Sequence, residues 1–380
     1  TRRRRLMAEA PIDLLTFRLE HAGRNFMDRK VKEAQKIRLA AYVLGLAGVA
    51  LFTFLLIQSG ASDVVRALAA VGPWLLVIAA FHLLPMLLDG LSWWILFPLG
   101  ERARYRTVFF MRWLGESVSN LLPVAQVGGD LVRARLAVLN GTRMSVSAAT
   151  VLVDITVSVF TQTVFTTLGL GLLILATGRT NLMGPALAGA PLAIAAVAGF
   201  YIVQRLGLFR LFTAIVSRWA TNPEWRSMAG KGGEVDEVLR ETYAKRHVIL
   251  ACCLSSITSW LIGSVEVWIG LYALGIPSSF DRAVILESVG QGVRSALFFI
   301  PGAIGVHEGG YLFVGGLLGI PGDAAFALAL IRRVRELALG IPGLIVWQLI
   351  EGGRAWRKHV LPVVRQSEKE AANEPQTKSP

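Results

Sequence analysis

The chain has 380 residues, of which 54% are hydrophobic and only 17% are charged, and its mean hydropathy is +0.54. Soluble domains average about 45–50% apolar and about 25% charged residues, so this composition excludes an ordinary soluble enzyme and a disordered chain. The net charge is +13, and the two cysteines, Cys252 and Cys253, are adjacent in an apolar run, a pattern that excludes both a disulfide framework and a zinc site.

The first segment, residues 1–38, is polar and basic. Ile12, Leu15 and Leu19 recur at helical spacing with Arg18 between them, which predicts a basic amphipathic helix on the anionic cytoplasmic leaflet. A solvated tether is the alternative. Because this lead is longer than the n-region of a secretory signal, we interpret the first apolar run as a membrane span.

Six stretches contain the roughly 20 mostly apolar residues that a span needs. They are residues 39–57, 73–97, 145–176, 185–203, 248–275 and 323–349. Two further apolar regions, 107–139 and 284–319, are interrupted midway by Pro and Gly, and each is shorter than the roughly 40 residues of two full spans. We therefore predict six full spans plus two re-entrant helical hairpins.

Cytoplasmic connections of membrane proteins collect Lys and Arg, and this rule orients the chain. With the N-terminus inside, segment 1–38, loop 204–247 and tail 351–380 are all cytoplasmic. Only Arg66, Arg179 and Arg282 then lie outside. Five arginines lie at membrane depth, namely Arg112, Arg294, Arg332, Arg333 and Arg335. This distribution explains the high net charge without nucleic-acid binding.

The predicted topology repeats the order span, span, hairpin, span with opposite orientation. We predict an all-α polytopic membrane protein whose domain 39–350 is an inverted repeat of residues 39–176 and 185–350, a common plan for transporters. A faint echo supports the repeat, because Glu116-Ser117-Val118 in the first hairpin matches Glu287-Ser288-Val289 in the second.

The first hairpin contains the sequence GESVSNLLPVAQVGGDLVRAR (115–135). Its predicted break residues are Pro123, Gly128 and Gly129, because proline removes a backbone donor and glycine permits a tight turn. Irregular backbone at membrane depth persists only if it is buried in protein or lines water, so this break should face a cavity. The candidate polar residues are Arg112, which we expect to pair with Glu116, together with Asn120, Gln126 and the anion-binding Arg133. A plain Pro-kinked helix with a cytoplasmic turn is the alternative.

The second hairpin contains the sequence SALFFIPGAIGVHEGGYLF (295–313). Its predicted break residues are Pro301, Gly302, Gly305, Gly309 and Gly310. His307 titrates near neutral pH in the unperturbed state, and Glu308 is a partner for it or for an arginine. The pair is not a zinc motif, because no histidine follows at the required spacing. The alternative is a glycine-packed turn at the external interface.

The last span contains Arg332, Arg333, Arg335 and Glu336 about ten residues from its start. An arginine at mid-membrane costs about 2.5–3.5 kcal/mol even on the lenient insertion scale. The group therefore requires partners, and we expect an Arg332–Glu336 pair and an anion such as a lipid phosphate, which guanidinium binds bidentately. The alternative is a shorter span with these bases at an interface.

Other ionisable groups are embedded in the apolar runs. They are His82, Asp89, Asp154 and Glu266, with Glu287 and Arg294 in the second hairpin. Such groups are either functional candidates or structural ion-pair partners.

Three segments together resemble a known family. SNLLPVAQVGGDLVRAR, FFIPGAIGVHEGGYLFVGGLLG and ALIRRVRELALGIPG are similar to the lysylphosphatidylglycerol synthase transmembrane-region family, and IPGAIGVHEGGY in particular resembles membrane proteins of hopanoid biosynthesis clusters. The resemblance implies a lipid flippase domain without the fused aminoacyl-transferase domain. The residues that it implies are Asn120, Pro123, Gly128, Gly129, Arg133, Pro301, Gly302, Gly305, Glu308, Gly309, Arg332 and Glu336.

We therefore predict a translocase of the bacterial inner membrane, with both termini cytoplasmic, that moves a phospholipid or hopanoid-type lipid between leaflets. The sequence contains no Walker-type phosphate loop, and we expect no cofactor and no metal. Alternatives are a non-transporting accessory protein of lipid biosynthesis and a membrane transferase that uses His307 and Glu308. Lipid-biosynthesis enzymes are candidate partners, and oligomerisation is left open.

Overall fold

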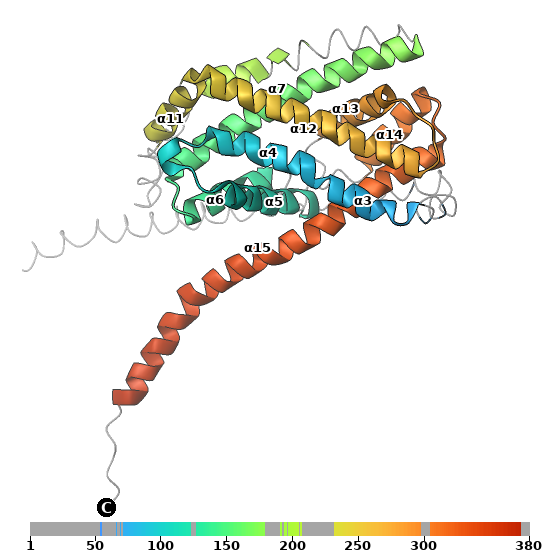
Figure 1. Ribbon diagram of the computed structural model, residues 1–380. Coiled ribbons are helices and arrows are strands. Elements are labelled where there is room, and N and C mark those ends of the chain that lie inside the picture. Colours follow the sequence, from blue (N-terminus) through green and yellow to red (C-terminus); the bar gives the residue numbers. More distant parts are fainter. Residues whose placement is uncertain are drawn as a thin grey trace, which may run out of the picture.

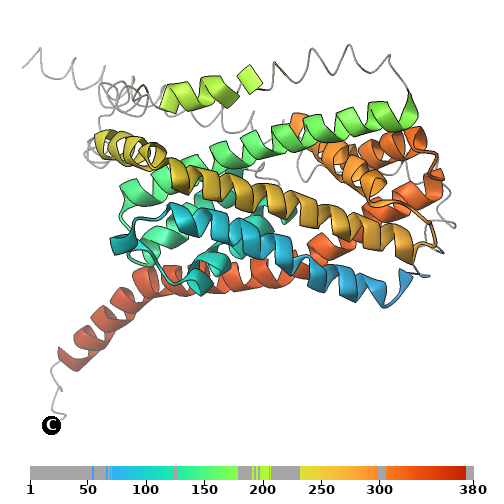
Figure 2. The same cartoon turned by 45° about the horizontal axis from the view of Figure 1, so that its top comes forward.

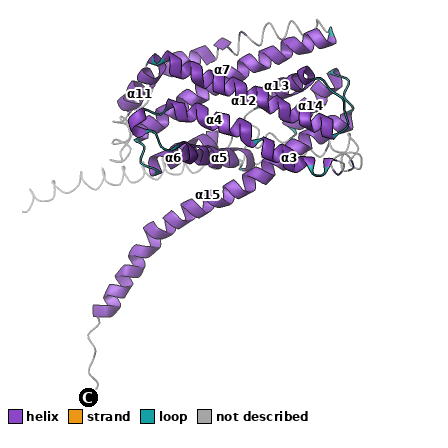
Figure 3. Cartoon of the chain, in the orientation of Figure 1, coloured by secondary structure: helices purple, strands orange, loops and turns teal. Residues whose placement is uncertain are grey.

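The computed structural model describes residues 54, 66, 69, 71–122, 127–178, 191, 194–195, 197–204, 206, 232–297 and 305–373, with side chains up to residue 350. This part of the chain is helical and contains no strand (Figure 3). The segment 1–38, nearly all of span 39–57 and much of span 185–203 lie outside the described residues.

The described helices form the same succession twice. The first unit consists of α3 (Trp74–Phe81), α4 (Leu83–Leu96), the 3₁₀ turn η1 (Leu99–Glu101), α5 (Tyr105–Leu121), α6 (Val127–Leu139) and α7 (Met144–Thr177). After α11 (Gly232–Ala244), the second unit consists of α12 (Arg246–Ala273), α13 (Phe280–Ala296), α14 (Val306–Leu317) and α15 (Gly322–Asn373). In each unit, a long element is followed by two short helices and then by another long helix.

The two units run in opposite directions through the bundle. Helices α4 and α12 lie side by side and antiparallel at its centre (Figures 1 and 2). The short pair α5–α6 enters from one end of the bundle and the short pair α13–α14 from the other (Figure 1). We call these pairs the first and second hairpin.

The helix lengths separate candidate spans from hairpin arms. Among the described residues, three segments are long and apolar enough to cross a membrane: Trp74–Leu96, Met144–Thr177 and Arg246–Ala273. They coincide with the predicted spans 73–97, 145–176 and 248–275. The hairpin arms have 12 to 17 residues, or about 18–25 Å at 1.5 Å per residue, less than the roughly 30 Å hydrocarbon core. Predicted span 323–349 lies inside α15.

The breaks between the hairpin arms differ in detail from the prediction. Helix α5 ends at Leu121 and Leu122 is extended, whereas α14 begins after Gly305, whose φ of 80° favours glycine. Four glycines expected at the breaks lie instead inside the helices that follow: Gly128, Gly129, Gly309 and Gly310. The other expected break residues (Pro123, Pro301 and Gly302), and Gln126, lie outside the described residues.

Close helix packing explains why glycine occupies those helical positions. A Cβ on Gly129 would collide with the backbone carbonyl of Gly115 and with the hydroxyl of Ser119 on the opposite arm. The two arms of the first hairpin therefore touch backbone to backbone, which compensates for the weak helix propensity of glycine.

Each hairpin also packs on the last helix of the other unit, α5 on α15 and α13 on α7. Ser117 on α5 occupies the space beside Gly343, and Ser288 on α13 occupies the space beside Gly169. These serines are the central residues of the repeated Glu-Ser-Val echo. The echo therefore marks two equivalent contacts in which a small side chain meets a glycine.

Apolar packing is divided between the two ends of the bundle. One buried cluster surrounds the first hairpin and includes Leu114, Leu136 and Val153. The other surrounds the second hairpin and includes Leu286 and Leu328. Large apolar side chains also face outward from the long helices, among them Leu84, Leu168 and Leu254, and this exterior fits a lipid environment.

The opposed hairpins predict where engineered thiols will react. Gly100 and Ser279 are both exposed, in the loops that precede the first and the second hairpin. In a chain whose Cys252 and Cys253 are replaced by serine, we expect G100C to react with a membrane-impermeant maleimide only from the cytoplasmic side and S279C only from the outer side.

Modification is measured as the mass added to the protein after maleimide treatment of intact cells and of inverted vesicles. Labelling of both positions from the same side would contradict the opposed orientation.

Candidate functional site

The first hairpin is tied to α7 by a buried aspartate. Arg112 of α5 and Arg133 of α6 both donate to Oδ2 of Asp154, at 2.7 and 2.5 Å. The Asp154 side chain is only 2% exposed, and Arg133 also bonds Asp130 at 2.9 Å. We call Arg112, Arg133 and Asp154 the first clamp, because one carboxylate holds both arms of the hairpin.

The second hairpin is tied to α15 by a buried arginine. Arg332 forms a bidentate pair with Glu287 of α13 and donates to the hydroxyl of Tyr311 of α14 at 2.9 Å. Tyr311 in turn donates to Glu287 at 3.0 Å. We call Glu287, Tyr311 and Arg332 the second clamp.

The two clamps occupy corresponding positions with opposite charge. Asp154 is the eleventh residue of α7 and Arg332 the eleventh residue of α15, and each contacts both arms of the hairpin before it. Each clamp satisfies a charge that would otherwise be buried without a partner, a state that costs several kcal/mol.

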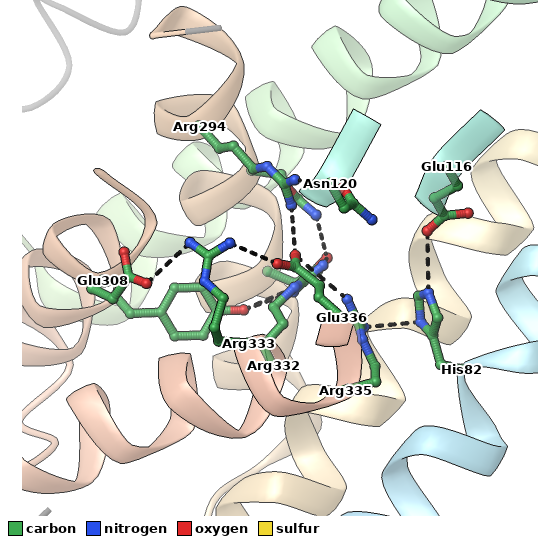
Figure 4. A network of polar contacts seen from close by, with 12 residues as sticks. His82, Glu116, Asn120, Arg294, Glu308, Arg332, Arg333, Arg335 and Glu336 are labelled. Carbon is green, nitrogen blue, oxygen red and sulfur yellow. Dashed lines mark hydrogen bonds and ion pairs between the residues drawn. The ribbon is translucent and has the colours of Figure 1, made fainter. Parts of the chain in front are cut away.

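Between the clamps, the inner ends of the hairpins meet. Arg294, near the end of α13, donates to Asn120 near the end of α5 at 3.0 Å and to Glu336 of α15 at 3.1 Å. Arg333 bonds Glu336 at 2.8 Å and Glu308 at 3.2 Å. These side chains come from α5, α13, α14 and α15 and point toward one another (Figure 4).

The same network continues to a histidine on the other side of α15. Arg335 pairs with Glu266 of α12 and lies 2.9 Å from Nδ1 of His82 (Figure 4). His82 also approaches Glu266 at 2.9 Å and Glu116 at 3.6 Å. We call the tip network the set His82, Glu116, Asn120, Glu266, Arg294, Glu308, Arg333, Arg335 and Glu336.

A local helix defect places His82 there. Helix α3 ends at Phe81 and α4 begins at Leu83, so His82 lies at the joint. Pro85 lacks the N–H that would bond the Phe81 carbonyl, and such a loss kinks helices.

A cavity of about 290 Å³ lies beside the tip network. We call it the central cavity. Both hairpins, α4, α7 and α12 line it, and its polar lining includes Asp89, Arg112, Glu116, Ser119, Asn120, Asp130, Arg133, Gln162, Gln291 and Arg294. Ile155, Val159 and Trp260 form an apolar part of the wall. The cavity therefore places three guanidinium groups next to an apolar wall.

Some of the residues predicted from the sequence line a cavity, and others form contacts inside the bundle. Six line the central cavity: Arg112, Glu116, Asn120, Gly129, Arg133 and Arg294. Arg335 and Glu336 line a second, water-sized cavity of about 10 Å³, together with Glu116 and Asn120. Arg332 and Glu287 belong to the second clamp.

His307 and Glu308 are buried and outside the lining of both cavities. The ring of His307 packs on Tyr311 at 4.6 Å between centroids. Glu308 accepts from the Gly305 backbone N–H at 2.8 Å, which caps α14, and pairs with Arg333. In this structure Glu308 thus caps α14 and pairs with Arg333, while His307 packs against Tyr311.

Two expected pairs along single helices are replaced by pairs between helices. Arg112 contacts Asp154 rather than Glu116, and Arg332 contacts Glu287 rather than Glu336. An exposed pair four residues apart contributes only about 0.2–0.5 kcal/mol, whereas a buried charge that loses its partner costs about 3–5 kcal/mol, so the buried contacts between helices dominate.

Sequence reasoning noted His82, Asp89, Asp154 and Glu266 but did not place them with the site. Asp154 and Glu266 are isolated charges in long apolar runs, and His82 and Asp89 share the run 73–97; an ionisable residue in such a run is a usable signal on its own. The structure adds their partners, which are 21 to 253 residues away in the chain.

A pair outside the bundle joins the loops at the outer end of the first hairpin. Arg143 bonds Glu101 at 2.6 Å, and this contact lowers the pKa of the Glu101 carboxyl below its ordinary value. The Arg143 side chain is 64% exposed, so the pair is screened by water.

The lysylphosphatidylglycerol synthase TM region family matches residues 39–343. The chain belongs to this family. The UPF0104 membrane protein of Methanothermobacter thermautotrophicus is 25% identical over 304 residues, which cover 75% of this chain and 86% of that protein. No solved structure matches the chain. The predicted family is thus confirmed, and this member is a helical membrane protein.

The first clamp predicts a large stability loss for Asp154→Asn. Removing one partner of a buried ion pair costs about 3–5 kcal/mol, because the remaining arginines lose their counter-charge. We expect a clearly lower Tm in detergent micelles, measured by thermal denaturation, whereas the control Glu101→Gln, at a half-buried surface carboxylate, stays near the wild type. Equal Tm values for the two variants would contradict the clamp.

The surface pair predicts a small pH-dependent effect. Because its folded-state pKa is lowered, Glu101 stabilises the fold above its unfolded-state pKa of about 4.3. This contribution disappears as the pH falls through the lowered folded-state value. We expect a small Tm difference between wild type and Glu101→Gln at neutral pH that vanishes in acid. A difference that grows in acid would contradict a stabilising Glu101–Arg143 pair.

Proposed function

We propose that this protein is a lipid translocase, flippase-like or scramblase-like, that passes the head group of an anionic phospholipid or hopanoid-type lipid through the central cavity. The observation that supports this proposal is the position of the cavity. It lies where the inner ends of two opposed hairpins meet, inside a bundle whose outer surface is apolar.

The chemistry of the cavity fits a phosphate group. Arg112, Arg133 and Arg294 line it, and planar guanidinium groups bind phosphate oxygens in bidentate fashion. A volume of about 290 Å³ suits a phosphate-bearing head group rather than a whole lipid. The acyl or polycyclic tails remain in the bilayer, beside Val159 and Trp260.

Acceptor groups of the protein itself occupy the arginines until a lipid phosphate binds. Asp89 lies 3.8 Å from Arg112, and Asn120 accepts from Arg294. An entering phosphate replaces these contacts, so the arginines exchange one set of acceptors for another. Such exchange keeps the charges solvated and avoids the cost of bare cations at membrane depth.

The inverted arrangement supplies a route to both leaflets. Opposed repeats around a midplane site permit alternating access by rocking of one unit against the other. On this proposal, the hairpins are re-entrant, the protein resides in a bacterial inner membrane and both termini are cytoplasmic. Family membership supports the lipid class, since the family is named for lysylphosphatidylglycerol synthase.

The decisive test is transport in liposomes. Purified protein should accelerate the movement of fluorescent phosphatidylglycerol between leaflets, followed by chemical quenching of the outer leaflet. Arg294→Gln should slow it roughly tenfold or more, because a hydrogen bond to a charged group contributes about 1.5–3 kcal/mol. The exposed Arg143→Gln serves as the matched control and should retain the wild-type rate.

Equal rates with wild-type protein and with empty liposomes would reject the translocase. Altered lipid chemistry in a deletion strain, with an unchanged leaflet distribution, would instead favour the transferase or the accessory protein.

A further inference from the structure

His82 faces charged groups from three other helices. Glu116 of α5, Glu266 of α12, and Arg335 with Glu336 of α15 surround it, while Asp89 lies on its own element. The His82 side chain is 13% exposed. An imidazole in this position is the one group of the tip network whose ordinary titration falls between about pH 5 and pH 8.

The two ring nitrogens of His82 face two different carboxylates. Nδ1 lies 2.9 Å from Oε2 of Glu266, and Nε2 lies 3.6 Å from Oε1 of Glu116. A neutral imidazole has a single N–H and no charge, whereas an imidazolium donates to Glu266 through Nδ1 and forms an ion pair with Glu116 through Nε2 at 3.6 Å. The protonated ring therefore bridges α5 to α12.

Arg335 provides the alternative arrangement. Its Nη1 lies 2.9 Å from Nδ1 of His82 and also bonds Glu266. Because Arg335 only donates, it bonds Nδ1 when that nitrogen has no proton. The site thus has two hydrogen-bond patterns that differ by one proton.

The charges of the tip network favour a proton at this position. The network contains three arginines, Arg294, Arg333 and Arg335, and four glutamates, Glu116, Glu266, Glu308 and Glu336. One positive charge on His82 makes the sum zero. Buried charge is costly when it is unbalanced. The negative charge of the network therefore favours a protonated His82, and the protonated ring in turn stabilises the network.

A route for the proton leads to the central cavity. Glu116 lines both the central cavity and the cavity of about 10 Å³ that His82 and Arg335 share. That volume is close to what one water molecule needs, and the polar side chains that line the cavity could hold such a water by hydrogen bonds. The imidazolium gives its Nε2 proton to the Glu116 carboxylate, and from there the proton passes to water in the central cavity. The neutral ring then adopts the tautomer with its proton on Nε2, in which Nδ1 accepts from Arg335 and no longer donates to Glu266.

We propose that His82 is a proton-binding site that couples lipid translocation to H⁺. This inference rests on the proposed function. Protonated His82 holds Glu116, and with it the inner end of the first hairpin, against α12. Deprotonation releases α5 from α12, so the Asn120–Arg294 contact between the two hairpins is free to open for the head group.

His307 is the other histidine inside the described bundle, and its surroundings differ. Its Nε2 has no hydrogen-bond partner among the residues that the structure describes, and the neighbouring Glu308 is engaged by Gly305 and Arg333. It lacks the paired carboxylates that make His82 a bridge. His307→Gln is therefore the matched control for His82→Gln.

The test measures lipid movement in liposomes that have the same pH on both sides. Between about pH 5 and pH 8, the wild-type rate should rise about fivefold or more, the lower end of a typical coupling free energy. His82→Gln should give a flat profile, whereas His307→Gln should retain the wild-type profile. Glu116→Gln, which preserves the shape of the side chain, should also flatten it.

A second readout is independent of transport. In ¹⁵N-histidine-labelled protein, the signal that disappears in folded, monodisperse His82→Gln should titrate in this pH range. A His82→Gln variant with the wild-type pH profile, or a His82 ring that does not titrate, would overturn the proton site. A titrating His82 in wild-type protein that moves no lipid would instead reject the translocase and leave the proton site standing.

Discussion

Neutralisation of buried charge is the constraint on which this structure depends. An arginine or a carboxylate at membrane depth persists only with a partner at hydrogen-bond distance, because the hydrocarbon offers none. The bundle meets this need with side chains from different helices, in the two clamps and in the tip network between them. The same contacts that neutralise the charges also fix the positions of the hairpins, so electrostatics and architecture are inseparable here.

The two halves reach this balance with inverted chemistry. In the first half an aspartate on the long helix receives two arginines, and in the second an arginine on the long helix receives a glutamate and a tyrosine. The backbone arrangement is thus repeated while the signs are exchanged. Consequently the clamp arginines of the first half, Arg112 and Arg133, line the central cavity, whereas the clamp arginine of the second half, Arg332, does not, and the cavity lies toward the first hairpin.

The location of the tip network suggests how packing and movement are combined. Apolar clusters hold each hairpin at its own end of the bundle, while the contact described between the inner ends, from Arg294 to Asn120, is polar. Polar contacts exchange partners more readily than interdigitated apolar side chains, which makes the centre the natural place for rearrangement. His82, which lines the water-sized cavity, adds a titratable imidazole to that centre.

The sequence by itself determined the membrane class, three long spans, the two interrupted regions and the family, because apolar run length and helix-breaking residues act locally. It also indicated which ionisable residues needed an explanation, since a charge in an apolar run is costly wherever the chain folds. Only the tertiary structure decided their partners. Asp154 receives Arg112 from 42 residues away and Arg335 meets His82 across 253 residues, and such distances leave no periodic signal in a single chain. The glycines illustrate the same division: Gly129 was predicted to break a helix, but contact with Gly115 keeps it inside one.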